Sequence, residues 1–122
     1  MILADTSVWI DHLRNGDRNL VRELQNTRIM IHPFIVGELA LGNMARRGEI
    51  LTLLQDLPQA EVATDAEVLH LIEKKRLMGR GIGFIDAHLI ASVLLSGAVK
   101  LWTRDKRLHA LAGDMGLACQ FS

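Results

Sequence analysis

Three acidic residues stand alone in stretches of the chain that are otherwise apolar. Asp5 is the only charged residue of the opening MILADTSVWI, Glu38 the only one of PFIVGELALGNMA, and Asp86 the only formally charged one of GIGFIDAHLIASVLLSGAV. Burying a lone carboxylate costs several kcal/mol unless a partner offsets the charge. A shared divalent cation is the natural partner for such a set. A fourth acid, Asp105, comes three residues after the apolar pair Leu101-Trp102.

Carboxylates of this kind form a hard, oxygen-rich ligand set, which suits Mg²⁺ or Mn²⁺ better than zinc. At an effective dielectric constant of 20, two carboxylates about 4 Å apart repel by roughly 4 kcal/mol, so four of them together require a cation. A bound Mg²⁺ keeps several waters, and it can stabilise the charge of an attacked phosphate. The residues therefore suggest metal-dependent hydrolysis of a phosphodiester.

Alternating strands and helices are expected to position these side chains. Apolar spacing, caps and turn residues predict strands at 1–4, 28–31, 99–102 and 117–119, with a minor strand at 61–63. The predicted helices are 6–13, 17–25, 33–46, 50–57, 64–77, 84–95 and 106–112. Asp17 is predicted to cap helix 17–25, and Pro33 is predicted to be the first residue of helix 33–46, which Gly48 terminates. The pattern Thr64-x-x-Glu67 predicts a capping box at the start of helix 64–77. Gly97 is predicted to terminate helix 84–95.

This alternation predicts one α/β domain over residues 1–122, with a parallel sheet and helices on both faces. Ligands of such folds bind beyond the carboxyl ends of the strands. Asp5 and Asp105 directly follow strands, and Glu38 and Asp86 lie near the starts of helices, so all four can converge at that edge. Taken singly, each acid has a simpler reading as a helix cap, a first-turn acid or a surface residue. Their common edge favours a shared site.

Composition narrows the class of protein. Lys and Arg total 14 against 14 Asp and Glu, so there is no strong net attraction to nucleic acid, and 49% hydrophobic residues exclude disorder. We expect no membrane segment and no signal peptide. The single cysteine, Cys119, fits a reducing cytoplasm.

Four motifs carry a resemblance to a known family. The opening LADTSVWI, the GEL around Glu38, the FIDAHLIAS around Asp86 and the LWTRDKRL around Asp105 come in the order and spacing of the PIN-domain ribonucleases. Within these, the chain is most similar to the VapC toxins of bacterial type II toxin–antitoxin pairs. The resemblance spans nearly the whole chain.

The resemblance implies a three-layer α/β/α sandwich with a parallel, about five-stranded sheet. It implies that Asp5, Glu38, Asp86 and Asp105 hold Mg²⁺, with Mn²⁺ as a possible substitute, in a catalytic site for RNA cleavage. Thr6, Ser7 and Thr103 match positions that support the acids. Members often carry a further acid after the third, where this chain has Ala87, His88 and Leu89, so the choice between one and two metal ions stays open.

The resemblance also implies partners: an inhibitory antitoxin, a second copy of the chain in a homodimer, and structured RNA such as tRNA or rRNA as substrate. Aromatic residues make up only 4% of the chain and Tyr is absent, so base stacking is not expected to dominate RNA binding. Basic side chains near the acids are expected to hold phosphates instead. The candidates are Arg80, Arg104, Lys106 and Arg107.

Two other functions stay open at this point. One is a PIN-like scaffold that binds a partner without catalysis. The other is a phosphoacceptor receiver domain, with Asp56 as acceptor and Lys100 beside it. A receiver domain needs paired acids after the first strand, whereas Asp5 stands alone there. It also needs its acceptor at the end of a strand, whereas Asp56 lies at the end of a predicted helix. Both differences disfavour this function.

Overall fold

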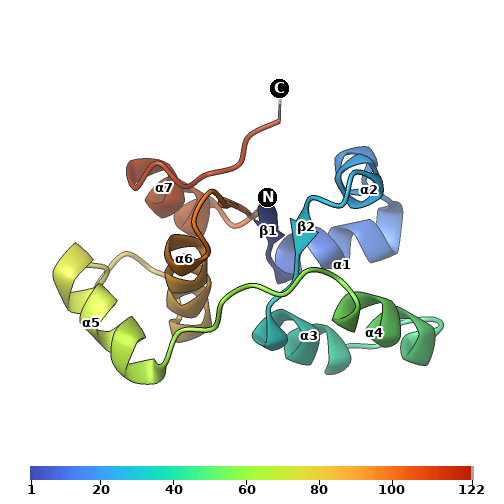
Figure 1. Cartoon of the computed structure of the whole chain (residues 1–122), viewed down its shortest axis with the longest axis horizontal. Helices are drawn as coiled ribbons and strands as arrows, with labels where there is room; N and C mark the ends of the chain where they lie inside the picture. The colour runs from blue at the N-terminus through green and yellow to red at the C-terminus, as the bar shows by residue number, and fades with distance from the viewer. Residues whose placement is uncertain (122) are drawn as a thin grey trace.

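Three parallel strands form the centre of the computed structural model, which describes residues 1–121 (Figure 1). They are β1 (Ile2–Ala4), β2 (Ile29–Met30) and β3 (Lys100–Trp102), in the order β2-β1-β3. Ile2 pairs with Ile29 on one side and with Lys100 on the other. Because β1 is the middle strand, its carboxyl end lies between those of its two neighbours.

Single-residue bridges add one extended segment at each edge of the sheet. Ile31 pairs in parallel with Gln59, and Leu101 pairs in parallel with Ala118. The Ile31 N–H donates to the Pro58 carbonyl at 2.8 Å, and the Leu101 N–H donates to the Leu117 carbonyl at 2.7 Å. The sheet therefore has three strands where about five were expected, and a single-residue bridge at each edge takes the place of a further strand. The predicted strand at 61–63 is wrong, because pairing on that edge falls at residue 59 instead.

Helices cover both faces of the sheet. Figure 1 shows α1 (Thr6–Asn15), α2 (Arg18–Gln25), α3 (Pro33–Ala40) and α4 (Arg47–Gln55) to one side of the strands. On the opposite side lie α5 (Asp65–Lys75), α6 (Phe84–Ser96) and α7 (Lys106–Asp114). The core between these layers contains fully buried Leu3, Ile35, Ile90 and Leu101. This arrangement confirms the predicted α/β sandwich.

Local capping signals placed most helix starts correctly. The Asp17 side chain accepts from the Leu20 N–H at 2.9 Å, and Pro33 is the first residue of α3. Thr64 and Glu67 form the predicted capping box, with reciprocal bonds of 3.1 and 2.9 Å. Gly97 ends α6 with a φ of 85°, a conformation that costs glycine little.

The expected helix 33–46 is too long by six residues. In the structure α3 ends at Ala40, a turn follows, and Gly48 lies inside α4 rather than at a helix end. The Arg47 guanidinium donates to the carbonyls of Ala40 and, at 3.1 Å, of Gly42. These bonds satisfy carbonyls that the end of α3 leaves without a partner. The Arg47 side chain, which belongs to the next helix, therefore stabilises the end of α3 at Ala40.

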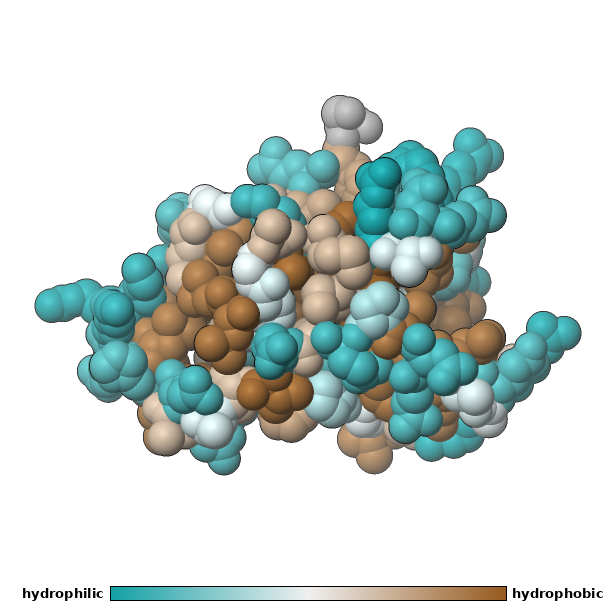
Figure 2. Space-filling view, in the orientation of Figure 1, coloured by the Kyte–Doolittle hydropathy of each residue, from teal (hydrophilic) through white to brown (hydrophobic). Residues whose placement is uncertain are grey.

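The surface mixes apolar and charged side chains. On the face shown in Figure 2, apolar surface gathers over α6 and the adjoining part of α5. Leu69 on α5 is 57% exposed, and Leu95 on α6 is 50% exposed. None of the helices within residues 1–121 combines the length and apolarity needed to cross a bilayer.

Candidate active site

Asp5 is the innermost of the four acids and is held at both carboxylate oxygens. It follows β1, is only 6% exposed, and caps α1 by accepting from the Ser7 N–H at 3.0 Å. The Ser7 hydroxyl also donates to Oδ1, and the Thr103 hydroxyl donates to Oδ2 at 2.6 Å. Oδ1 therefore has both lone-pair directions occupied, whereas Oδ2 keeps one free.

The two hydroxyls that hold Asp5 also fix the loop after β3. Because each hydroxyl has a single hydrogen, donation to Asp5 leaves its oxygen free to accept. The Ser7 oxygen accepts from the Arg104 N–H at 2.9 Å, and the Thr103 oxygen accepts from the Asp105 N–H at 3.0 Å. The carboxylate of Asp5 and the 103–105 loop are thus positioned by the same two side chains.

Glu38 lies in the second turn of α3 and its side chain is exposed. The Thr6 hydroxyl donates to its Oε1 at 3.2 Å, which links α3 to the first residue of α1. The three hydroxyls therefore have separate tasks: Ser7 and Thr103 bind Asp5, and Thr6 binds Glu38. The residue types alone did not reveal this division.

Asp86 lies in the first turn of α6 and is half-buried. Its Oδ2 accepts from the Gly83 N–H at 3.1 Å, which caps the helix. Burial raises the pKa of the Asp86 carboxyl, the bond from Gly83 opposes this shift, and the negative charges of Asp5, Asp105 and Glu38 raise the pKa further. The negative charges of the other three acids therefore act on the Asp86 carboxyl.

Asp105 follows β3 by three residues and caps α7, where its Oδ1 accepts from the Leu108 N–H at 2.9 Å. Its side chain is exposed. Each of the four acids is thus tied to the fold through one oxygen or more, and each retains acceptor capacity that no donor within residues 1–121 uses.

No cationic side chain of residues 1–121 pairs with any of these four acids. Glu23 shows the contrast: this carboxylate is 5% exposed and has Arg22 at 3.4 Å and Arg28 at 3.5 Å. Glu23, a buried acid, is thus neutralised, whereas Asp5, which is buried to a similar degree, has only hydroxyl and backbone donors as partners.

The four carboxylates are not drawn together at a single point. Within residues 1–121, no three His, Cys, Asp or Glu side chains are arranged closely enough to hold a metal ion. Mutual repulsion explains this spacing, since like charges without a counter-ion move apart where solvent allows it. Glu38 and Asp105 are exposed at this edge and are free to do so.

The four basic residues expected near the site fall into two groups. Arg80 pairs with Asp114 at 2.8 Å, and Arg104 pairs with Asp11 and Asp17. Lys106 and Arg107 are exposed and form no ion pair within the described part of the chain. The Arg107 side chain lies over Gly81, so close that a Cβ at that position would be 2.6 Å from its Cδ.

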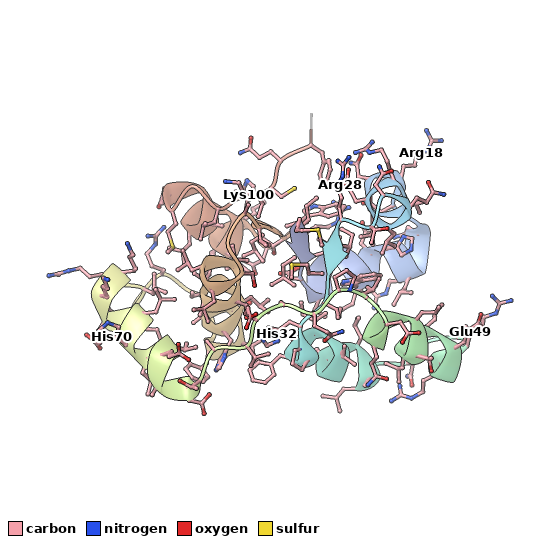
Figure 3. The ribbon with its side chains drawn as sticks, in the orientation of Figure 1. Arg18, Arg28, His32, Glu49, His70 and Lys100 are labelled. Atoms are coloured by element: carbon pink, nitrogen blue, oxygen red, sulfur yellow. The ribbon has the colours of Figure 1, made fainter. Side chains whose placement is uncertain are left out.

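Two buried histidines lie on the helices that carry Glu38 and Asp86, and the sequence patterns gave no reason to single them out. His32 caps α3 by accepting from the Phe34 N–H at 3.0 Å, and Figure 3 shows it in the interior. Burial, together with nearby His88, lowers the pKa of His32 to about 4. His88 on α6 contacts Asp65 at 3.0 Å, and Phe34 stacks edgewise against both imidazoles. These histidines join α3 to α6 through packing.

The parallel sheet, with helices on both faces and acidic side chains beyond the carboxyl ends of its strands, places the chain among the α/β proteins that bind ligands at that edge. The PIN domain matches residues 2–114, and the chain belongs to the PIN-domain family. It is 50% identical over 118 residues to Ribonuclease VapC32 of Mycobacterium tuberculosis strain CDC 1551 / Oshkosh, covering 97% of this chain and 95% of that protein. The same identity and coverage hold for Ribonuclease VapC32 of strain ATCC 25618 / H37Rv. The resemblance to the VapC group is thereby confirmed.

Proposed function

We propose that this chain is a Mg²⁺-dependent endoribonuclease that hydrolyses phosphodiester bonds in structured RNA, tRNA or rRNA, as the toxin of a toxin–antitoxin pair. The observation that carries the proposal is the set of four carboxylates that no cationic side chain within residues 1–121 neutralises. RNA as the substrate is supported by the two relatives, both of which are ribonucleases by name.

The donor set fits a hard divalent cation. Asp5, Glu38, Asp86 and Asp105 offer only oxygen, which suits Mg²⁺ and also Mn²⁺. When bound, the ion would activate a water molecule as the nucleophile and offset charge on the attacked phosphate. Because Glu38 and Asp105 are exposed and the four side chains are not gathered at one point, we expect them to turn inward on metal binding.

The remaining polar groups hold this ligand set in place. Ser7 and Thr103 orient Asp5 so that one lone pair of Oδ2 stays free, and Thr6 leaves Oε2 of Glu38 free. The Gly83 N–H fixes Oδ2 of Asp86 and leaves Oδ1 free. Outer hydrogen bonds of this kind orient metal ligands and tune them.

RNA is expected to be held through its phosphates. Lys106 and Arg107 are the exposed basic side chains near Asp105 without an ion pair among residues 1–121. With 4% aromatic residues and no Tyr, the chain has little surface for base stacking. Phosphate contacts position an RNA without reading its sequence, so its folded shape would determine which RNA is cut.

The proposed partners are an antitoxin and a second copy of the chain, acting in the cytoplasm, where the unpaired Cys119 would stay reduced. The exposed Leu69 and Leu95 on α5 and α6 support an apolar contact between copies. Sedimentation equilibrium should show a dimer, and Leu95→Glu should weaken it. Co-expression with the product of a neighbouring short reading frame should suppress RNA cleavage.

The test of the proposed activity is cleavage of total cellular RNA by the purified protein with and without Mg²⁺. We expect discrete fragments that require the metal and disappear with Asp5→Asn and with Asp86→Asn, and the fragment ends would identify the substrate. Asp56→Asn is the matched control, because Asp56 is exposed at the end of α4, far in sequence from the site motifs.

Two outcomes would contradict the proposal. Absence of cleavage by folded, antitoxin-free protein in Mg²⁺ and in Mn²⁺ would favour a partner-binding scaffold instead. Cleavage that persists in both Asn variants would indicate a contaminating nuclease. A receiver domain is disfavoured because Asp56 follows a helix and not a strand.

A further inference from the structure

Arg104 is bound at both ends to the helices that precede β2. Its backbone N–H donates to the Ser7 hydroxyl at 2.9 Å, at the start of α1. Its guanidinium contacts Asp11 Oδ2 at 3.0 Å through Nε and also contacts Asp17 Oδ2. The loop that connects β3 to α7 is therefore fastened to α1 and to the α1–α2 turn.

Both carboxylates that bind Arg104 are themselves fixed. Asp17 caps α2 through its other oxygen, which accepts from the Leu20 N–H at 2.9 Å, and its side chain is only 10% exposed. Asp11 accepts from Asn15 at 3.1 Å through its other oxygen. These two carboxylates engage Nε and one Nη of Arg104 and offset its positive charge, which weakens its attraction for a phosphate and holds its side chain against α1 and the α1–α2 turn.

We propose that Arg104 is a positioning residue, which holds the 103–105 loop in register with Asp5, and that it does not contact RNA. The loop carries Thr103, which donates to Asp5, and Asp105, which is one of the proposed metal ligands. The inference rests on the proposed function for its effect on cleavage. The proposal gives the basic residues near the site two different roles: Arg104 positions the 103–105 loop, whereas Lys106 and Arg107 contact phosphates.

RNA binding in EDTA separates the two roles without needing cleavage. Each phosphate contact that is lost flattens the slope of log Kobs against log salt by about 0.7 to 0.9. Arg107→Gln should flatten the slope by that amount, whereas Arg104→Gln should leave it unchanged. Arg18→Gln is the matched control, since Arg18 projects from α2 at the periphery (Figure 3) and has no ion pair within residues 1–121.

Cleavage kinetics should show the positional effect. Arg104→Gln and Asp17→Asn should each lower kcat by about 10- to 100-fold with little change in KM, because displacing a ligand by a fraction of an ångström misaligns the reacting groups. Asn at position 17 retains the oxygen that caps α2, so it removes the charge pair while leaving the cap. Arg104→Lys should restore only part of the rate, since it offers one donor group in place of a fork.

Thermal unfolding provides a test that is independent of RNA. If the two charges act as a pair, the double variant Arg104→Gln/Asp17→Asn should melt no lower than the less stable single variant. Losses in melting temperature that simply add would overturn the inference. So would a flattened salt slope for Arg104→Gln, or tighter RNA binding by Asp17→Asn with kcat intact. If the wild-type protein cleaves no RNA, the proposed function fails, but the unfolding cycle still decides whether Arg104 and Asp17 act as a pair, and the salt slope in EDTA still decides whether Arg104 contacts phosphate.

Discussion

At the scale of single residues, Thr103 links two of the site acids. Its hydroxyl donates to Asp5 at 2.6 Å and accepts from the Asp105 N–H at 3.0 Å, and the side chain is 7% exposed. Valine has nearly the same shape as threonine, but it has no hydroxyl group that could donate to Asp5 or accept from the Asp105 N–H. Thr103→Val therefore leaves a buried carboxylate oxygen and a backbone N–H without partners, which costs more than the loss of an average hydrogen bond.

We expect Thr103→Val to lower the free energy of unfolding by about 1–3 kcal/mol and to reduce RNA cleavage. Urea denaturation measures the first effect, and initial cleavage rates measure the second. Thr52→Val is the control, because the Thr52 hydroxyl is exposed and donates only to the Gly48 carbonyl. Thr103→Ser should restore both properties. Equal stability of Thr103→Val and wild type would show that this bond contributes nothing.

Asp86 provides a second prediction at the same scale. Because burial and three neighbouring negative charges raise the pKa of Asp86 in the folded state, its ionised form destabilises the metal-free protein near neutral pH. That destabilisation is absent at low pH and appears as pH rises through the folded pKa. Asp86→Asn should therefore raise the melting temperature at pH 7 in EDTA while abolishing cleavage. A lower melting temperature would mean that the carboxylate is needed for folding.

At the scale of elements, the loop of residues 79–83, which contains three glycines and precedes α6, is tied to α7. Arg80 pairs with Asp114 on α7, and the Arg107 side chain covers Gly81. Gly81 has a φ of 79°, and a Cβ there would approach Arg107 Cδ to 2.6 Å. The Arg107 side chain can therefore occupy this position only because Gly81 has no side chain.

Gly81→Ala should lower stability by about 1 kcal/mol through backbone strain and should also weaken RNA binding by displacing Arg107. Gly79→Ala is the matched control, because Gly79 has a φ of 72° but nothing within 4 Å of its Cβ position. Both variants should lose similar stability in urea, and only the first should lose affinity for RNA in EDTA. Equal affinities would show that Arg107 does not bind RNA from this position.

How far the sequence predicts these elements depends on whether the determining contacts are local. The capping box at Thr64 and the start of α3 at Pro33 depend on neighbours in sequence, and both were predicted. The end of α3 depends on Arg47 reaching back to Ala40 and Gly42, so periodicity could not locate it. Asp5, Glu38 and Asp86 could be selected because they are isolated in apolar stretches, and Asp105 because it follows a predicted strand. Which hydroxyl holds which acid depends on contacts such as Thr103 to Asp5, 98 positions apart, and no local pattern encodes them.

At the scale of the whole molecule, the buried histidines connect the helices that carry two of the acids. His32 is fully buried at the start of α3, and its pKa is lowered to about 4. A histidine with a lowered folded pKa binds protons more weakly in the folded state than in the unfolded state. Its contribution to stability is therefore complete above the unfolded pKa of about 6.5 and is lost as pH falls toward 4.

We expect the free energy of unfolding to fall by about 3 kcal/mol from this residue alone between pH 6.5 and pH 4. Urea titrations across that range, with His32→Asn beside wild type, measure the contribution. Asparagine can still accept from the Phe34 N–H and cap α3, but it does not titrate. The variant should be less stable at pH 7 and show a shallower decline on acidification. Parallel curves for the two proteins would assign the pH dependence to other groups.

The single-residue bridges at Gln59 and Ala118 also bear on how copies of this protein behave when they are crowded together. A long, open strand at the edge of a sheet is a template on which another chain can continue the ladder, and this leads to aggregation. Here both outer segments pair at one residue only, so neither presents an extended row of free N–H and C=O groups. The formal net charge at pH 7 is +0, so copies are not kept apart by repulsion. Short sheet edges therefore limit the aggregation of a chain whose copies do not repel one another through net charge.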